Sequence, residues 1–126
     1  MADLTDVQIG SIVWNMIENV PTYISGTMQS LVDNEIYFSE NVTGDSIGTT
    51  AVDEKYQPAI ISLTASAVLR MMELQGADVS NIRLGDFSVS KGQGSSTFGI
   101  ADKMREDGIQ KLEALGTKIN YFKTLS

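Results

Sequence analysis

The stretch whose residue types come closest to a known chemistry is Gly92-Gln93-Gly94-Ser95-Ser96-Thr97, which precedes a predicted helix. Backbone N–H groups at the start of a helix attract anions, so a glycine-rich turn at that place can hold a phosphate. The pattern is incomplete, because Thr97 stands where the dinucleotide-binding fingerprint needs a third glycine, and no Gly-Lys-Ser/Thr follows. The favoured interpretation of residues 92–96 is therefore a flexible linker, and we predict no cofactor.

Acidic side chains are the second group that could do chemistry. Asp53 and Glu54 are adjacent in sequence, as are Glu106 and Asp107. Adjacent residues point to different parts of a helix surface, so neither pair forms a ready acid–base dyad. Asp45 lies in a polar stretch without the spacing of a calcium-binding loop. We expect the two adjacent pairs to lie on solvated faces.

Histidine and cysteine are both absent from the 126 residues. Without them the protein has no Cys or His nucleophile, no Ser-His-Asp triad and no zinc site of the Cys/His type. We therefore predict no enzyme activity, no catalytic residue and no metal site. The net charge of −7 argues against a protein that clamps DNA through a basic face. It is compatible with a channel through which DNA slides.

A central helix is predicted at residues 58–75. Its apolar residues cover nearly every face, so neighbouring elements must bury it on several sides. Pro58 suits the first helical turn, and Gly76 suits the position just past the end. Arg70 and Glu73 fall within this segment, and the uncharged run before Arg70 is shorter than the about 20 residues that a bilayer requires. We expect a soluble protein that does not contact a membrane.

Three further helices are predicted at residues 5–20, 27–41 and 98–115. In the first, Thr5 and Gln8 have the spacing of a capping box. Apolar residues recur at helical spacing in the first and last of them, and charged residues occupy the other face of the last. The expected buried stripes are Ile9, Ile12, Val13, Met16, Ile17 and Val20 in the first helix and Ile100, Ala101, Met104, Gly108, Leu112 and Leu115 in the last, whose solvated face is Lys103, Arg105, Glu106, Asp107, Gln110, Lys111 and Glu113.

The remaining segments complete an all-α fold, a single domain of residues 1–126 with about four helices around the buried central one. Trp14 lies off the stripe of its helix and forms a second packing surface, either within the chain or at a contact between subunits. Residues 82–90 alternate between apolar and polar types, which indicates extended chain or a short hairpin. Gly116 ends the last helix, and residues 117–126 form an extended tail too short to make a core.

The segment Arg83-Leu84-Gly85-Asp86-Phe87-Ser88 directly follows the central helix. From its residue types alone, this segment is predicted to be a turn in which Asp86 caps nearby N–H groups while Phe87 fills part of the core. Residues 30–123 combine the helix KYQPAIISLTASAVLRMMELQG, the segment IRLGDFSVSKG, an amphipathic helix and the closing LGTKINYFKT. In order and length they resemble the head–tail connector, or adaptor, proteins of tailed bacteriophages. The residues that match the turn of that family are Gly85, Asp86, Phe87 and Ser88.

The resemblance implies a structural virion protein of the neck, between capsid and tail, that is assembled in the host cytoplasm. It implies a ring, usually a dodecamer, seated beneath the portal protein and in contact with a downstream neck or tail protein of the stopper or terminator type. Genomic DNA would pass through the lumen without specific binding. The insert at residues 92–96 is longer than the family pattern.

The tail is the expected docking segment, because aromatic and basic residues are typical interface anchors. Its candidates are Ile119, Tyr121, Phe122 and Lys123. By resemblance the partner is the portal, and an adjacent subunit is the other choice. Alternatively, Tyr121 and Phe122 fold back onto their own core.

Two other functions stay open at this level. The chain could be a small helical protein-interaction or accessory domain of a cellular complex, binding its partner through a central groove. An enzyme is the least favoured. Solution mass separates the first two, because a connector forms a large closed oligomer whereas an accessory domain is a monomer or dimer.

Overall fold

The computed structural model describes residues 3–76, 83–84, 87–88 and 97–115. Within these ranges it confirms the all-α class, with four α-helices and a single turn of 3₁₀-helix between the first two. The elements are α1 (Asp6–Met16), η1 (Thr22–Ile24), α2 (Met28–Thr43), α3 (Gln57–Leu74), β1 (Arg83–Leu84), β2 (Phe87–Ser88) and α4 (Thr97–Ala114).

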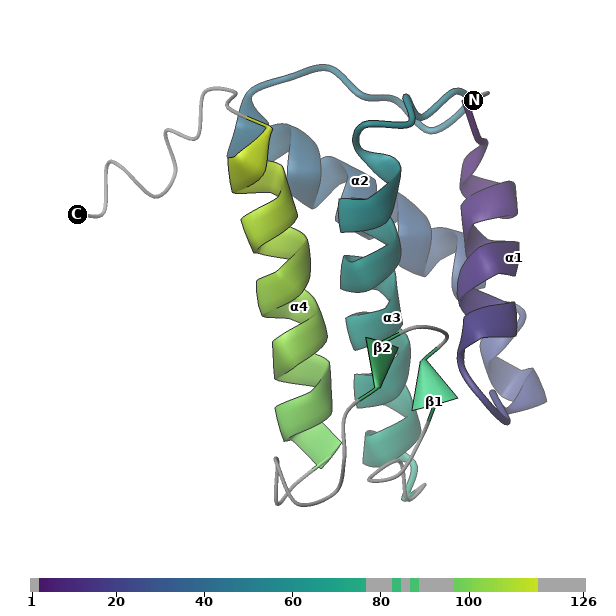
Figure 1. Ribbon diagram of the computed structural model, residues 1–126. Helices are drawn as coiled ribbons and strands as arrows, with labels where there is room; N and C mark the ends of the chain where they lie inside the picture. Colours follow the sequence, from purple (N-terminus) through teal and green to yellow (C-terminus); the bar gives the residue numbers. More distant parts are fainter. Residues whose placement is uncertain (1–2, 77–82, 85–86, 89–96, 116–126) are drawn as a thin grey trace.

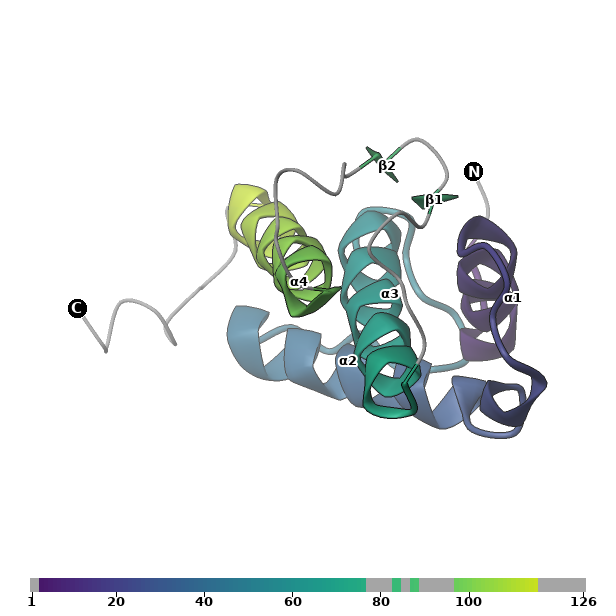
Figure 2. The same cartoon turned by 90° about the horizontal axis from the view of Figure 1, so that it is seen from below.

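The helix predicted to be central is α3, and it occupies the middle of the bundle. Figure 1 shows α1, α3 and α4 side by side, with α2 crossing behind them. Seen from below, α2 covers one face of this layer, and β1 and β2 lie on the other side of α3 (Figure 2). Consequently α1 and α4 form opposite edges of the molecule, with α3 between them.

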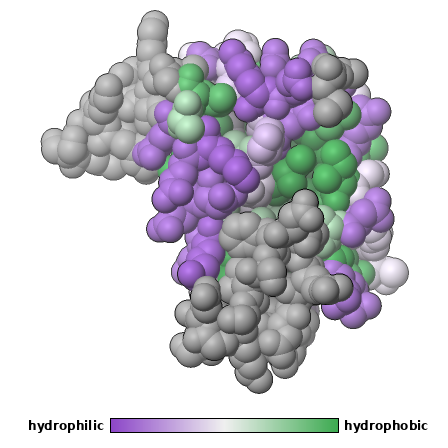
Figure 3. All heavy atoms as spheres, viewed as in Figure 1, coloured by the Kyte–Doolittle hydropathy of each residue, from purple (hydrophilic) through white to green (hydrophobic). Residues whose placement is uncertain are grey.

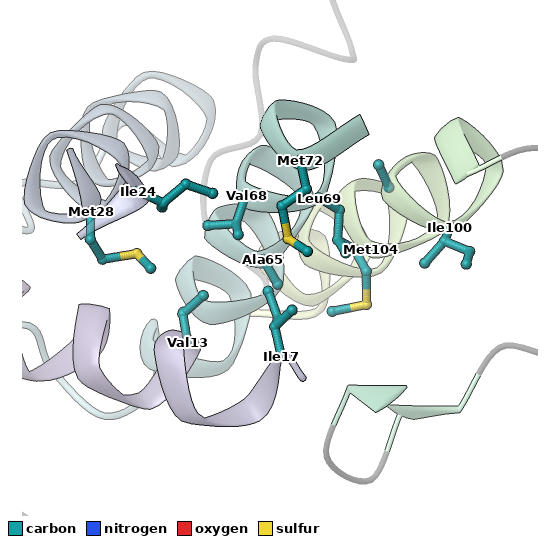
Figure 4. Packing of buried hydrophobic residues seen from close by; sticks show 11 residues of the cluster. Val13, Ile17, Ile24, Met28, Ala65, Val68, Leu69, Met72, Ile100 and Met104 are labelled. Atoms are coloured by element: carbon teal, nitrogen blue, oxygen red, sulfur yellow. The ribbon is translucent and has the colours of Figure 1, made fainter. Parts of the chain in front are cut away.

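Two apolar clusters surround α3 and explain its apolar faces. Figure 4 shows the first, in which side chains from the α1 side, from η1 and from the start of α2 meet those of α3 and α4. The second lies toward the start of α3, where Ile60 and Leu63 pack against α1, α2 and α4. Burial of a Leu or Ile side chain stabilises a fold by about 1.5–3 kcal/mol, so these contacts dominate the packing. The first cluster includes Val13, Ile17, Ile24, Met28, Ala65, Val68, Leu69, Met72, Ile100 and Met104.

The start of α1 matches the prediction, and its end does not. Thr5 is the N-cap, and the reciprocal hydrogen bonds of the capping box with Gln8 are both present. The helix stops at Met16 rather than residue 20, because Ile17 turns to extended backbone and Asn19 adopts a left-handed conformation with φ 60°. Asparagine tolerates that region better than most residues, so the chain leaves the helix before the proline.

One residue of the predicted α1 stripe was placed wrongly. Ile12 is 39% exposed, whereas Ile9, Val13 and Ile17 are buried as expected. The stripe therefore faces α2 and α3 through a narrower set of side chains than the periodicity indicated.

A glycine in the left-handed conformation stands just past the end of α2 and of α3. Gly44 adopts a left-handed conformation with φ 76° just past the end of α2, and its N–H donates to the carbonyl of Glu40. Gly76 does the same after α3, with φ 90°, as predicted. These conformations strain any residue with a Cβ atom, so glycine stops each helix at that point.

The hairpin alternative for residues 82–90 is confirmed by the backbone. Leu84 pairs with Phe87, and Arg83 with Ser88, in antiparallel register. Predictions for the turn residues Gly85 and Asp86, for the side chains of Phe87 and Ser88, for the linker at 92–96 and for the tail at 117–126 lie outside the described residues.

Candidate functional site

The two carboxylates of the predicted pair on α4, Glu106 and Asp107, lie in different surroundings. Glu106 is exposed, but Asp107 is half-buried and does not simply face water as predicted. Its Oδ2 accepts hydrogen bonds from Ser62 Oγ at 2.8 Å and Lys111 Nζ at 2.6 Å. Burial acts to raise the pKa of Asp107, but these two hydrogen bonds outweigh it and hold that pKa below its usual value.

Ser62 and Lys111 bring together the groups of a serine–lysine hydrolase, with Nζ 3.4 Å from Oγ. The arrangement does not suit catalysis. Ser62 is only 4% exposed, and its hydroxyl donates to Asp107 instead of facing a space for a substrate. The Lys111 ammonium is ion-paired with the same carboxylate. We conclude that this cluster joins α3 to α4.

Arg105 was predicted to lie on the solvated face of α4, where it is partly exposed and also contacts α2. Its guanidinium lies over the ring of Phe38, 4.5 Å from the centroid, and its Nη1 is 3.4 Å from Glu35 Oε1. Burial raises the pKa of Glu35, although Arg105 opposes the shift. These contacts join α4 to α2, and sequence periodicity could not reveal them because the partners are far apart in the chain.

The carboxylates around residue 50 hold the loop that leads into α3. Asp45 Oδ2 accepts from the Tyr56 hydroxyl at 2.6 Å, so it is engaged within the fold and not simply solvated. Burial raises the pKa of Tyr56 to about 12, and Asp45 adds to the shift. Asp53 Oδ1 accepts from the backbone N–H of Lys55 at 3.0 Å. We assign these side chains a structural role in holding the loop.

A pair of carboxyl groups that sequence reasoning missed links α1 to α2. Asp6 is 7% exposed; its Oδ1 accepts from the Val7 N–H at 2.7 Å and its Oδ2 from Gln29 Nε2 at 3.1 Å. The Asp33 carboxyl lies beside it, and a hydrogen bond between the two carboxyls requires a proton on one of them. Burial, followed by the neighbouring Asp6, raises the pKa of Asp33 to about 6. The hydrogen bond from Asp33 lowers the pKa of Asp6, although burial opposes it.

Beside this pair, α1 and the start of α2 enclose a hollow of about 250 Å³, called here the α1–α2 hollow. Gly10 packs tightly against α2, since a Cβ atom there would be 2.9 Å from Met28 Cγ. Trp14 is half-buried; it packs against the first core cluster and lines the hollow. Its role in a subunit contact stays a prediction. Other lining residues are Val7, Ser11, Ser25, Met28 and Gln29.

The charged residues are distributed unevenly along the chain. All nine Lys and Arg residues lie at position 55 or later, so every charged side chain in residues 1–54 is acidic. Within α1 itself the one charged residue is the buried Asp6, and the hollow is lined by apolar and uncharged polar side chains. The outer face of α4 mixes both signs, and a shallow depression there is lined by Asp102, Arg105, Glu106, Ile109, Gln110 and Glu113. A count of charge by segment would have revealed this asymmetry from the sequence.

Metal binding and membrane crossing are two further roles on which the described ranges bear. No group of three acidic side chains there lies close enough to hold a metal ion. None of the described helices combines the length and apolarity needed to cross a membrane. The α1–α2 hollow, which is lined by apolar and uncharged polar side chains, is the candidate binding surface.

Comparison with known proteins returned no match among protein-family models, curated proteins or solved structures. The resemblance to connector proteins stays a prediction from the sequence, chiefly from the GDFS segment and the order of elements around the central helix.

Proposed function

We propose that this protein is an assembly subunit that forms a closed ring and acts as a head–tail connector of a tailed bacteriophage. The observation that carries the assembly role is the α1–α2 hollow, in which Val7 and Trp14 remain open to solvent. Val7 is 56% exposed although it borders other apolar side chains. An apolar concave surface of this kind suits contact with another protein.

The arrangement of the helices supports a ring over a two-fold dimer. The edges formed by α1 and α4 lie on opposite sides of α3 (Figures 1 and 2). The hollow beside α1 has no charged lining residue, whereas the depression on α4 is lined mostly by charged ones. Contact between unlike edges is heterologous, and it closes into a ring when the rotation between subunits allows. Figure 3 shows further hydrophobic surface between α3 and α1, bordered by hydrophilic residues. Such a patch provides additional area for a neighbour.

The position in the virion is proposed from the resemblance. The ring would sit beneath the portal in the neck, contact a downstream neck or tail protein and extend the DNA channel. A net charge of −7 supports a lumen that releases DNA, because phosphate contacts by Lys and Arg supply most non-specific affinity. Ile119, Tyr121, Phe122 and Lys123 are proposed as the docking residues of the tail.

Electron microscopy of the purified protein tests this function. In negative stain at high protein concentration we expect closed rings with a central lumen, with rotational symmetry in the class averages. Open filaments would support heterologous contact without the connector role. A field of uniformly small particles would contradict both parts of the proposal.

A further inference from the structure

We infer that the α1–α2 hollow binds residues 117–126 of a second copy of this chain. This inference rests on the proposed function, because it assumes that copies associate through unlike edges. It goes further by naming the occupant of the hollow and by choosing an adjacent subunit over the portal as the partner of the tail.

The size and lining of the hollow suit a side-chain anchor from a peptide. Its volume of about 250 Å³ lies below the roughly 300–1,000 Å³ of small-molecule sites. Trp14, Val7 and Met28 supply apolar surface, while Ser11, Ser25 and Gln29 offer hydrogen-bonding groups, and no charged side chain lines the space. Aromatic anchors in apolar pockets with a polar surround carry most of the binding energy in many interfaces.

Charge complementarity favours the C-terminal segment as the source of that anchor. Residues 117–126 contain Lys118 and Lys123 and no Asp or Glu, beside the aromatic residues Tyr121 and Phe122. The hollow lies in the half of the chain whose charged side chains are all acidic. Gln29 on its wall donates a hydrogen bond to Asp6. A basic segment is attracted to this edge, and its association is faster for the same reason.

Topology favours a second copy over the same molecule. The segment starts after α4, and within one molecule α3 separates α4 from α1 (Figures 1 and 2). In a ring of unlike edges, by contrast, the α4 edge of one subunit lies beside the α1 edge of the next.

The single tryptophan, Trp14, lines the hollow, so its fluorescence reports on occupancy. In the full-length chain we expect blue-shifted emission at high concentration and a red shift on dilution. Tyr121→Ala together with Phe122→Ala should leave the emission red-shifted at every concentration. Ser11→Arg should block the hollow and weaken association about tenfold or more. Asn15→Arg, exposed on α1 and outside the hollow, is the matched control and should behave like the parent chain.

Mixing two defective chains distinguishes a second copy from the chain's own tail. The Ser11→Arg chain keeps its tail, and the Tyr121→Ala/Phe122→Ala chain keeps an open hollow. Adding the first to the second should restore the blue-shifted emission. A chain that carries all three substitutions should not restore it.

The solution mass of the same samples separates this inference from the proposed function. Rings in which the Trp14 emission is unchanged by the tail substitutions would overturn the inference, because something other than the tail would fill the hollow. The same result would leave the proposed connector role unaffected. A monomer whose blue-shifted emission is independent of concentration, and is lost in the tail variant, would assign the hollow to the chain's own tail. Failure of the mixed chains to restore the signal would also overturn the inference.

Discussion

Gly108 of α4 lies directly against Leu63 of α3. A Cβ atom at position 108 would be 2.7 Å from Leu63 Cγ, and it would also be 3.0 Å from the backbone carbonyl oxygen of Ala59. Real Cβ atoms do not approach other heavy atoms so closely, and the backbone carbonyl cannot rotate away as a flexible side chain can. The absence of a side chain at Gly108 therefore sets the distance between the central helix and α4.

We expect Gly108→Ala to destabilise the fold by about 1–3 kcal/mol, through overpacking against Leu63. The sign is informative, because Gly to Ala in an unobstructed helix stabilises by about 1 kcal/mol. Denaturant unfolding followed by circular dichroism measures the difference. Gly26→Ala is the control, since no other heavy atom lies within 4 Å of the added methyl group, and it should stay within about 0.5 kcal/mol. A stabilised Gly108→Ala chain would show that α3 and α4 are further apart.

The Asp6–Asp33 pair predicts a dependence of stability on pH. The pKa of Asp33 is raised from 3.8 to about 6, so its stabilising contribution is complete below pH 3.8 and is lost as pH rises through 6. The pKa of Asp6 is lowered, so its contribution is present above its usual pKa and is lost as the solution becomes more acidic. Taken together, the pair stabilises the fold most near pH 4, and its contribution falls as pH rises through 6.

Asp33→Asn removes this titration while keeping a donor for Asp6. Near pH 7.5 we expect the variant to exceed the parent chain by about 1 kcal/mol, allowing for solvent screening of a pair that is only partly buried. Thermal unfolding across the pH range measures it. Asp3→Asn, at an exposed carboxylate near the same helix, should leave the difference between pH 5 and pH 7.5 unchanged. An unchanged pH profile in Asp33→Asn would mean that the two carboxyls do not share a proton.

The capping box makes a separate prediction for α1. Thr5→Ala removes the oxygen that accepts from the Gln8 N–H at 3.1 Å, so we expect a loss of about 1 kcal/mol in chemical denaturation. Thr5→Ser retains the hydroxyl and should lie within about 0.5 kcal/mol of the parent chain. Equal losses in both variants would assign the effect to the threonine methyl group.

The proposed lumen makes a prediction for DNA. Fluorescence anisotropy at physiological salt should give a Kd for duplex DNA no tighter than about 10⁻⁴ M, because the chain has nine basic and 16 acidic residues. Affinity in the micromolar range with a steep salt dependence would instead indicate a true DNA-binding surface and would count against a channel wall.

Local features of this fold could be predicted from sequence, and long-range contacts could not. The capping box at Thr5 and the left-handed Gly76 depend on a few neighbouring residues, and the burial of α3 follows from its composition. The place of Arg105 against Phe38 depends on how α4 meets α2, which no periodicity contains. The Asp6–Asp33 pair likewise exists only because α1 and α2 cross where they do.

The candidate site shows the same division. Trp14 stood out from the stripe of its helix, but the hollow beside it also needs Ser25, Met28 and Gln29 from the next segments. Sequence analysis could therefore single out one wall of the site and not the cavity. The acidic half of the chain was visible in the sequence from the start, and it became interpretable once α1 was seen to form an edge.

The measurement that tests the central claim most directly is the solution mass of the full-length protein across a wide concentration range. Sedimentation equilibrium or native mass spectrometry should find a closed oligomer near the dodecamer of the 13.7 kDa chain, in exchange with small species on dilution. A monomer or dimer at every concentration up to the solubility limit would contradict the ring and favour a small accessory domain.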